Sequence, residues 1–106
     1  MKKNHIKKKK LSRECWNLDY ELECWLYKHL LVYKKEARKV VDLEYHKFKY
    51  NDKEYTQLEV INRLIVILET LISEHFDIAL ESGERANELK DEMYDLLKLI
   101  HWSLWW

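Results

Sequence analysis

Four acidic side chains in the C-terminal half of the chain are spaced as metal ligands would be. Glu74 and Asp77 are three residues apart, and so are Glu92 and Asp95. Residues three apart lie on one face of a helix, and a turn at Ser82-Gly83 would bring Glu74 level with Glu92. Facing carboxylates repel unless a cation lies between them, and Mg²⁺ prefers oxygen ligands. The spacing predicts a Mg²⁺ site; the other interpretation is a solvated charged helix face, because such pairs arise by chance in acidic helices.

The same residues resemble a family motif. The segments Glu74-His75-Phe76-Asp77 and, fourteen residues later, Glu92-Met93-Tyr94-Asp95-Leu96-Leu97 look like the acidic motif of MazG-type all-α nucleoside triphosphate pyrophosphohydrolases. The resemblance covers residues 73–104. It implies that the four acids bind Mg²⁺, which orients a triphosphate and activates water. The chain departs from the family pattern at Asp77, where the family has Glu, and at Tyr94, where it has a small residue.

The composition predicts a helical protein. The 106 residues include no proline and a single glycine, Gly83, and 47% of them are hydrophobic. Strand-rich chains need many turns, and turns favour these two residue types. We therefore expect an all-α fold, an antiparallel three-helix bundle over residues 11–106, after a basic arm at 1–10. The helices are expected at about 12–50, 52–81 and 84–106, the first of them unusually long.

Apolar periodicity indicates how these helices pack. In the first helix one stripe recurs at alternating spacings of four and three residues, through Leu11, Cys15, Leu18, Leu22, Trp25, His29 and Val32. The second helix carries two apolar stripes, which predicts two packed neighbours and a central position. Both expected loops are short, so consecutive helices should be antiparallel neighbours.

The unequal helix lengths predict self-association. The end of the first helix and the start of the second extend beyond the third, which leaves aromatic residues without a neighbour in one copy. Large exposed apolar surfaces usually mark partner contacts, so we expect a homo-oligomer, most simply a two-fold dimer. The expected interface residues are Trp16, Trp25, Tyr45, Phe48, Tyr55, Trp102, Trp105 and Trp106.

Two histidines lie at matching positions in the expected hairpin of helices. His29 and His75 stand 22 residues before and 24 residues after Asn51, in or beside apolar stripes. We expect them to form a polar core layer that fixes the helix register. A buried histidine pair could also hold a metal or sense pH.

Charge is distributed unevenly along a chain whose formal net charge is zero. Six lysines and no acid occur in residues 1–10, so the rest of the chain is net acidic. Lys7, Lys8, Lys9 and Lys10 are candidate nucleic-acid contacts through phosphate binding; the alternatives are an import signal and a solubilising terminus. Apolar runs are too short to span a membrane. The two cysteines, nine residues apart on one helix, cannot bond within it, which predicts a cytoplasmic, reducing location.

These features favour a small self-associating helical protein that binds a macromolecular partner, with no cofactor. The make-up fits a virus- or phage-encoded accessory or host-targeting factor. The alternative is a Mg²⁺-dependent nucleoside triphosphate pyrophosphohydrolase.

Overall fold

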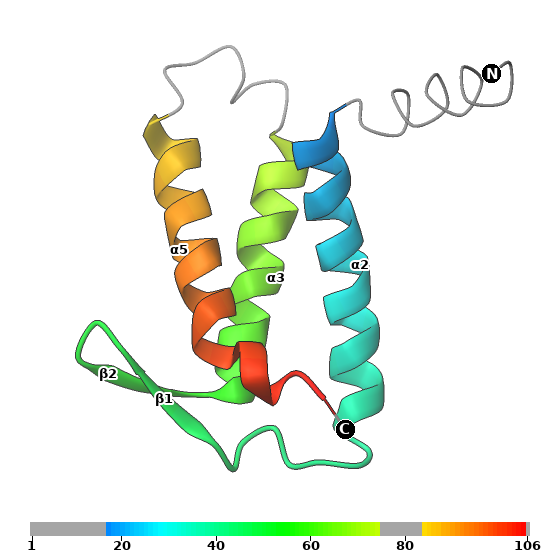
Figure 1. The fold of residues 1–106 in the computed structure, drawn as a ribbon, viewed down its shortest axis with the longest axis vertical. Helices are drawn as coiled ribbons and strands as arrows, with labels where there is room; N and C mark the ends of the chain where they lie inside the picture. Colours follow the sequence, from blue (N-terminus) through cyan, green and yellow to red (C-terminus); the bar gives the residue numbers. More distant parts are fainter. Residues whose placement is uncertain (1–16, 75–83, 106) are drawn as a thin grey trace, which may run out of the picture.

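The computed structural model describes residues 17–74 and 84–105 (Figure 1). The basic arm, residues 75–83 and Trp106 lie outside the described residues. The described chain is mostly helical, as expected, and consists of three long helices, a two-stranded antiparallel sheet and one 3₁₀ turn. In chain order these are α2 (Leu18–Ala37), β1 (Lys47–Tyr50), β2 (Lys53–Thr56), α3 (Gln57–Ser73), α5 (Glu84–Ile100) and η1 (His101–Ser103).

The predicted helix over 12–50 is wrong at its C-terminal end, because α2 stops at Ala37. Ala37 is fully buried, and its carbonyl accepts hydrogen bonds from the N–H groups of Val40 and Val41 in a tight reversal. The next residue, Asp42, accepts at its carboxylate from the backbone N–H of Glu44 at 2.9 Å, which stabilises a further turn. The chain therefore leaves the helix axis and runs under the bundle.

A β-hairpin occupies the segment that was expected to be helical. Strands β1 and β2 pair Phe48 with Tyr55 across the ladder, and Asn51 and Asp52 form the two-residue loop. Both loop residues are left-handed, with φ of 51° and 63°, as a type I′ hairpin turn requires. Asn51 is thus a turn residue, and the all-α prediction needs this correction.

Helix α3 begins later than the predicted residue 52. Its cap is a capping box in which the Glu59 N–H donates to the Thr56 hydroxyl at 3.2 Å and the Thr56 N–H donates to the Glu59 carboxylate at 3.0 Å. The helix ends at Ser73, and Glu74 already has φ −101° and ψ 14°. The predicted continuation to residue 81 is therefore wrong at Glu74, and residues 75–81 lie outside the described part.

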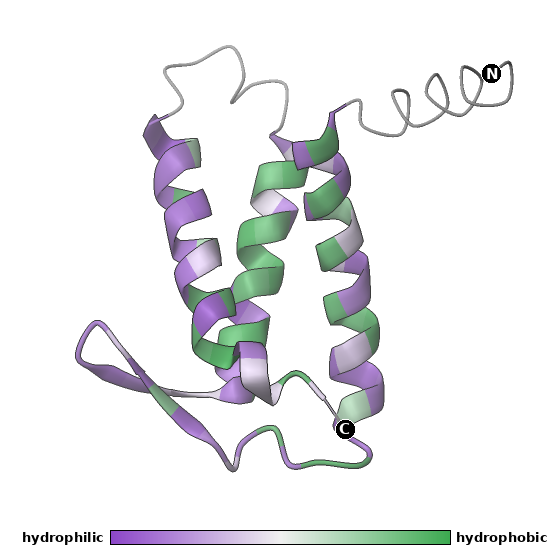
Figure 2. Cartoon of the chain, in the orientation of Figure 1, coloured by the Kyte–Doolittle hydropathy of each residue, from purple (hydrophilic) through white to green (hydrophobic). Residues whose placement is uncertain are grey.

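The prediction that the second helix is central is confirmed: α3 lies between α2 and α5 (Figure 1). Its side chains are buried toward both neighbours, and Ile61, Leu64 and Leu68 are completely inaccessible to water. Hydrophobic residues run along nearly the whole of α3, whereas α5 is largely hydrophilic outside its contact stripe (Figure 2). Each fully buried aliphatic side chain contributes about 1.5–3 kcal/mol relative to its exposed state, and α3 supplies more of the buried hydrophobic residues than any other element.

The helices form a thin slab of 53 × 37 × 19 Å. With α3 in the middle, α2 and α5 are the outer helices (Figure 1). An outer helix buries only one side against the core, so the sequence decides whether its remaining surface is polar or apolar.

Candidate functional site

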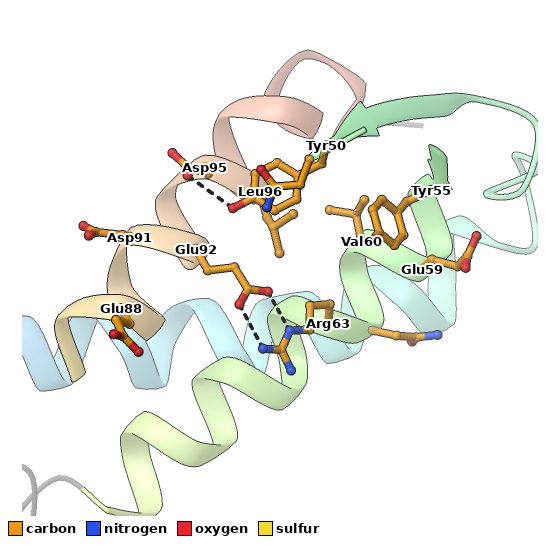
Figure 3. A pocket seen from close by; sticks show the side chains of 12 residues that line it. Tyr50, Tyr55, Glu59, Val60, Arg63, Glu88, Asp91, Glu92, Asp95 and Leu96 are labelled. Atoms are coloured by element: carbon orange, nitrogen blue, oxygen red, sulfur yellow. Dashed lines mark hydrogen bonds and ion pairs between the residues drawn. The ribbon is translucent and has the colours of Figure 1, made fainter. Parts of the chain in front are cut away.

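Two features stand out: a cleft beside the hairpin and an apolar stripe on the outside of α2. The cleft has a volume of about 720 Å³ and lies between the hairpin, α3 and α5 (Figure 3). Its walls carry the rings of Tyr50 and Tyr55, the guanidinium of Arg63, and carboxylates that include Glu92 and Asp95.

Arg63 and Glu92 join α3 to α5 across this cleft. Arg63 Nε donates to Glu92 Oε2 at 2.6 Å and Nη2 donates to Oε1 at 2.9 Å, which is a two-pronged, charge-assisted contact. These hydrogen bonds hold the pKa of the Glu92 carboxyl below its usual range and raise the pKa of Arg63. Both oxygens of Glu92 are therefore engaged by a cationic side chain of the same protein.

Asp95 points toward a different partner. The Tyr50 hydroxyl donates to Asp95 Oδ2 at 3.3 Å, a long hydrogen bond that ties the end of β1 to α5 (Figure 3). Partial burial, followed by the nearby Asp95 charge, raises the pKa of Tyr50, so the phenol stays protonated and can donate at neutral pH. Glu92 and Asp95, three residues apart, thus serve two separate contacts.

The structure does not bring Glu74 level with Glu92. Glu74 lies at the C-terminus of α3, 3.6 Å from Arg85 Nη1 at the start of α5. Glu92 is level with Arg63, which lies eleven residues before Glu74, or about 16 Å along a helix. The expected register assumed a tight turn at Ser82-Gly83, but the connection begins at Glu74, so the helices pair with an offset.

The predicted set of four metal ligands is therefore not assembled as expected. Glu74 and Glu92 lie at different heights, and Asp77 lies outside the described residues. Within residues 17–74 and 84–105, no three histidine, cysteine or acidic side chains are grouped so that they could hold a metal ion.

His29 is on the surface and not in a polar core layer, so that prediction is corrected. Its ring stacks on Trp25 with centroids 3.9 Å apart and an angle of 18° between the planes. Its Nδ1 also lies 2.7 Å from the Trp25 carbonyl oxygen, one helical turn earlier. The pair forms a fixed, flat aromatic feature on the outside of α2. His75 lies outside the described residues.

This aromatic pair belongs to an exposed apolar stripe that we call the α2 stripe, defined as Leu18, Leu22, Trp25, His29 and Val32. The exposed fractions are 60% for Leu18, 48% for Leu22, 57% for Trp25 and 53% for Val32. At 100° per residue the stripe lies about 120° around the helix from the side buried in the core. Its alternating spacing of four and three residues is that of a coiled-coil seam.

A second exposed aromatic group lies where the chain ends. Trp102 is 87% exposed, Trp105 is 68% exposed and Tyr45 is 75% exposed, and the last two line the same small groove of about 230 Å³. Of the other expected interface residues, Phe48 and Tyr55 are half-buried against the protein's own core, which is a correction to that prediction. Trp16, Trp106 and the lysines at 7–10 lie outside the described residues.

The backbone carrying these tryptophans is held by two side chains that the sequence analysis did not single out. The Tyr33 hydroxyl lies 3.1 Å from both the Ser103 and the Trp105 carbonyl oxygens. Gln57, only 3% exposed, donates from Nε2 to the Ser103 carbonyl oxygen at 3.0 Å. The signal in the sequence was a glutamine at the start of a strongly apolar helix, where a polar side chain needs a partner.

No helix in the described part of the chain combines the length and the apolar character that crossing a membrane requires. Comparison of the chain with known protein families, with curated proteins and with solved structures gives no match.

Proposed function

We propose that this protein acts by binding other protein chains, and that its first partner is a second copy of itself. The observation that carries the proposal is the α2 stripe, in which Leu18, Leu22, Trp25 and Val32 are each about half exposed or more. Single exposed apolar residues are ordinary, but an aligned row of them marks an interaction surface.

The spacing of the stripe favours a helical partner. A row with alternating steps of four and three residues stays in line along a supercoiled pair, where each side chain fits between those of the other helix. The α2 stripe runs from Leu18 to Val32 and so offers a seam of about 21 Å along the helix. One helix pair of this length is small among specific interfaces, so we expect a dimer that dissociates in the micromolar range.

The aromatic end is the surface best suited to a different protein partner. Tyr45 comes from the connection between α2 and β1, whereas Trp102 and Trp105 come from the C-terminal segment, and all three lie mostly exposed. Tryptophan and tyrosine are enriched among the residues that contribute most to binding. Tyr33 and Gln57 fix the backbone of this segment, and a fixed surface loses less entropy on binding than a mobile one.

The experiment compares two leucines on the same helix. Leu22 belongs to the α2 stripe and Leu31 does not, yet they are similarly exposed, at 48% and 41%. The Leu22→Glu variant should be a monomer at about 50 µM by size exclusion with light scattering, because a charge in the seam must be desolvated on association. The Leu31→Glu variant is the matched control and should associate as the unmodified chain does. Equal loss of association in both variants, or in neither, would contradict the proposal.

The Mg²⁺-dependent nucleoside triphosphate pyrophosphohydrolase is the second candidate, since five acidic residues (Glu59, Glu88, Asp91, Glu92 and Asp95) line the cleft. We rank it second because Glu92 and Glu74 are each paired with an arginine. Incubation with Mg²⁺ and nucleoside triphosphates tests it directly. Pyrophosphate release that disappears in the Glu92→Gln variant would support the hydrolase.

A further inference from the structure

Helix α2 carries acidic residues in its first turn and basic residues in its last turn. Asp19 and Glu21 lie in its first turn, and Lys34 and Lys35 lie in its last turn. Glu21 and Lys35 are both exposed and are two turns either side of Lys28. All three lie along one edge of the α2 stripe, since each directly precedes a seam position in the four-three spacing.

We propose that two copies associate through the α2 stripe with their α2 helices antiparallel. The inference deepens the self-association proposed above and rests on it. In this arrangement the acidic end of each helix lies beside the basic end of the other, and Glu21 of each copy faces the partner's Lys35. A parallel pair would instead bring Glu21 toward the partner's Leu26 and would place the two acidic ends together, which costs free energy.

The same alignment matches the apolar layers of the seam. With the two-fold axis near Lys28, Leu22 packs against the partner's Val32, and Trp25 packs against the partner's His29. Because Trp25 and His29 already stack on each other within one copy at 3.9 Å, two such pairs meet around the axis as four stacked rings. Because the rings of each copy are already stacked before association, less conformational entropy is lost on binding.

Lys28 opposes the pairing, because the positively charged Lys28 side chains of the two copies come close to each other near the two-fold axis. Its side chain is exposed and long enough to turn toward water. The two Glu21–Lys35 contacts lie at the ends of the seam, about 10 Å along the helix from Lys28. The repulsion between the two Lys28 side chains therefore does not change these contacts.

Charge exchange tests the orientation. The single variants Glu21→Lys and Lys35→Glu each turn two attractive contacts of the dimer into repulsive ones. We expect each to weaken association about tenfold at low salt, and we expect the double variant Glu21→Lys/Lys35→Glu to restore it. The control Glu21→Lys/Lys98→Glu has the same net charge but places the new glutamate on α5, so it should stay as weak as Glu21→Lys alone. Dissociation constants come from sedimentation velocity, with circular dichroism to check that each variant is folded.

The outcomes separate the two proposals. Restoration by the first double variant, and not by the control, supports the antiparallel seam. Single variants without effect, or weakened singles that the double does not restore, overturn the orientation and leave self-association through the stripe standing. An unmodified chain that stays monomeric at all concentrations overturns both.

Discussion

The Ser103 carbonyl oxygen accepts from two side-chain donors as well as from the Trp105 backbone N–H, and this predicts how much each side chain contributes to stability. Gln57 Nε2 lies 3.0 Å from it and the Tyr33 hydroxyl lies 3.1 Å from it. Tyr33→Phe removes the hydroxyl and keeps the ring, while Gln57 still donates to Ser103. Gln57→Leu removes the amide and keeps an apolar side chain of similar size, while Tyr33 still donates. Each single variant should therefore lose about 1 kcal/mol of unfolding free energy, the net value of one hydrogen bond.

The double variant should lose no more than the sum. With both side-chain donors gone, the Ser103 carbonyl still accepts from the Trp105 backbone N–H at 3.0 Å, so it is not left unsatisfied. Gln57 Nε2 also lies 3.4 Å from the Tyr33 hydroxyl, and each single variant already removes that contact, so we expect a total loss of about 2 kcal/mol or less. At neutral pH the hydroxyl is a donor throughout, because burial raises the pKa of Tyr33.

The assay is urea unfolding followed by far-ultraviolet circular dichroism on the four proteins of the cycle. The protein concentration should be low, about 2 µM, so that self-association does not add to the apparent stability. Single variants that keep the full unfolding free energy, within about 0.3 kcal/mol, would refute the two hydrogen bonds and with them the anchoring of the C-terminal aromatic segment.

Three further predictions concern the cleft, the hairpin turn and the seam. Glu92→Gln should cost about 1 kcal/mol at pH 7, because the pair with Arg63 is charge-assisted but partly exposed. The pKa of Glu92 is lowered in the folded state, so its contribution to stability is present above about pH 4.5 and is lost as the pH falls through the folded pKa. In urea titrations the unfolding free energies of the unmodified protein and the variant should therefore converge in acid. A difference in unfolding free energy that persists in acid would count against the ion pair. Asp52→Gly should raise the unfolding free energy by about 0.5 kcal/mol, because glycine accepts the φ of 63° without strain; a thermal melt showing destabilisation would argue against the type I′ turn. Lys28→Gln should tighten the dimer by about threefold by removing a like-charge contact near the axis, and weaker association in sedimentation would be inconsistent with the antiparallel seam.

The core was predictable from the sequence because it depends on a long periodic signal. Two apolar stripes on one helix require two neighbours, and α3 has them in α2 and α5. The start of this helix was predicted wrongly at residue 52, although Thr56 followed by Glu59 has the spacing of a capping box.

The hairpin was missed because scarce glycine was taken as evidence against turns. Asparagine and aspartate also adopt the left-handed conformation, and Asn51-Asp52 does so after a strand, β1, that alternates lysine with aromatic residues. This turn also changes the case for self-association. Phe48 and Tyr55, two aromatic residues expected at the interface, are folded back onto the core, and the α2 stripe and the aromatic group of Tyr45, Trp102 and Trp105 stay exposed.

The pairing of acidic residues could not be predicted because register depends on where a connection begins. A shift of the α3 terminus from residue 81 to Ser73 moves every residue on α5 relative to α3 by several positions. Glu92 then meets Arg63 and not Glu74. Side-chain partners across helices are therefore the least predictable feature of this chain.

Sedimentation equilibrium of the unmodified protein tests the central claim most directly. The chain has a mass of 13.2 kDa, and between about 2 and 200 µM the average mass should rise from near that value toward twice it, as expected of a micromolar dimer. A mass that stays at 13.2 kDa over the whole range would contradict self-association through α2.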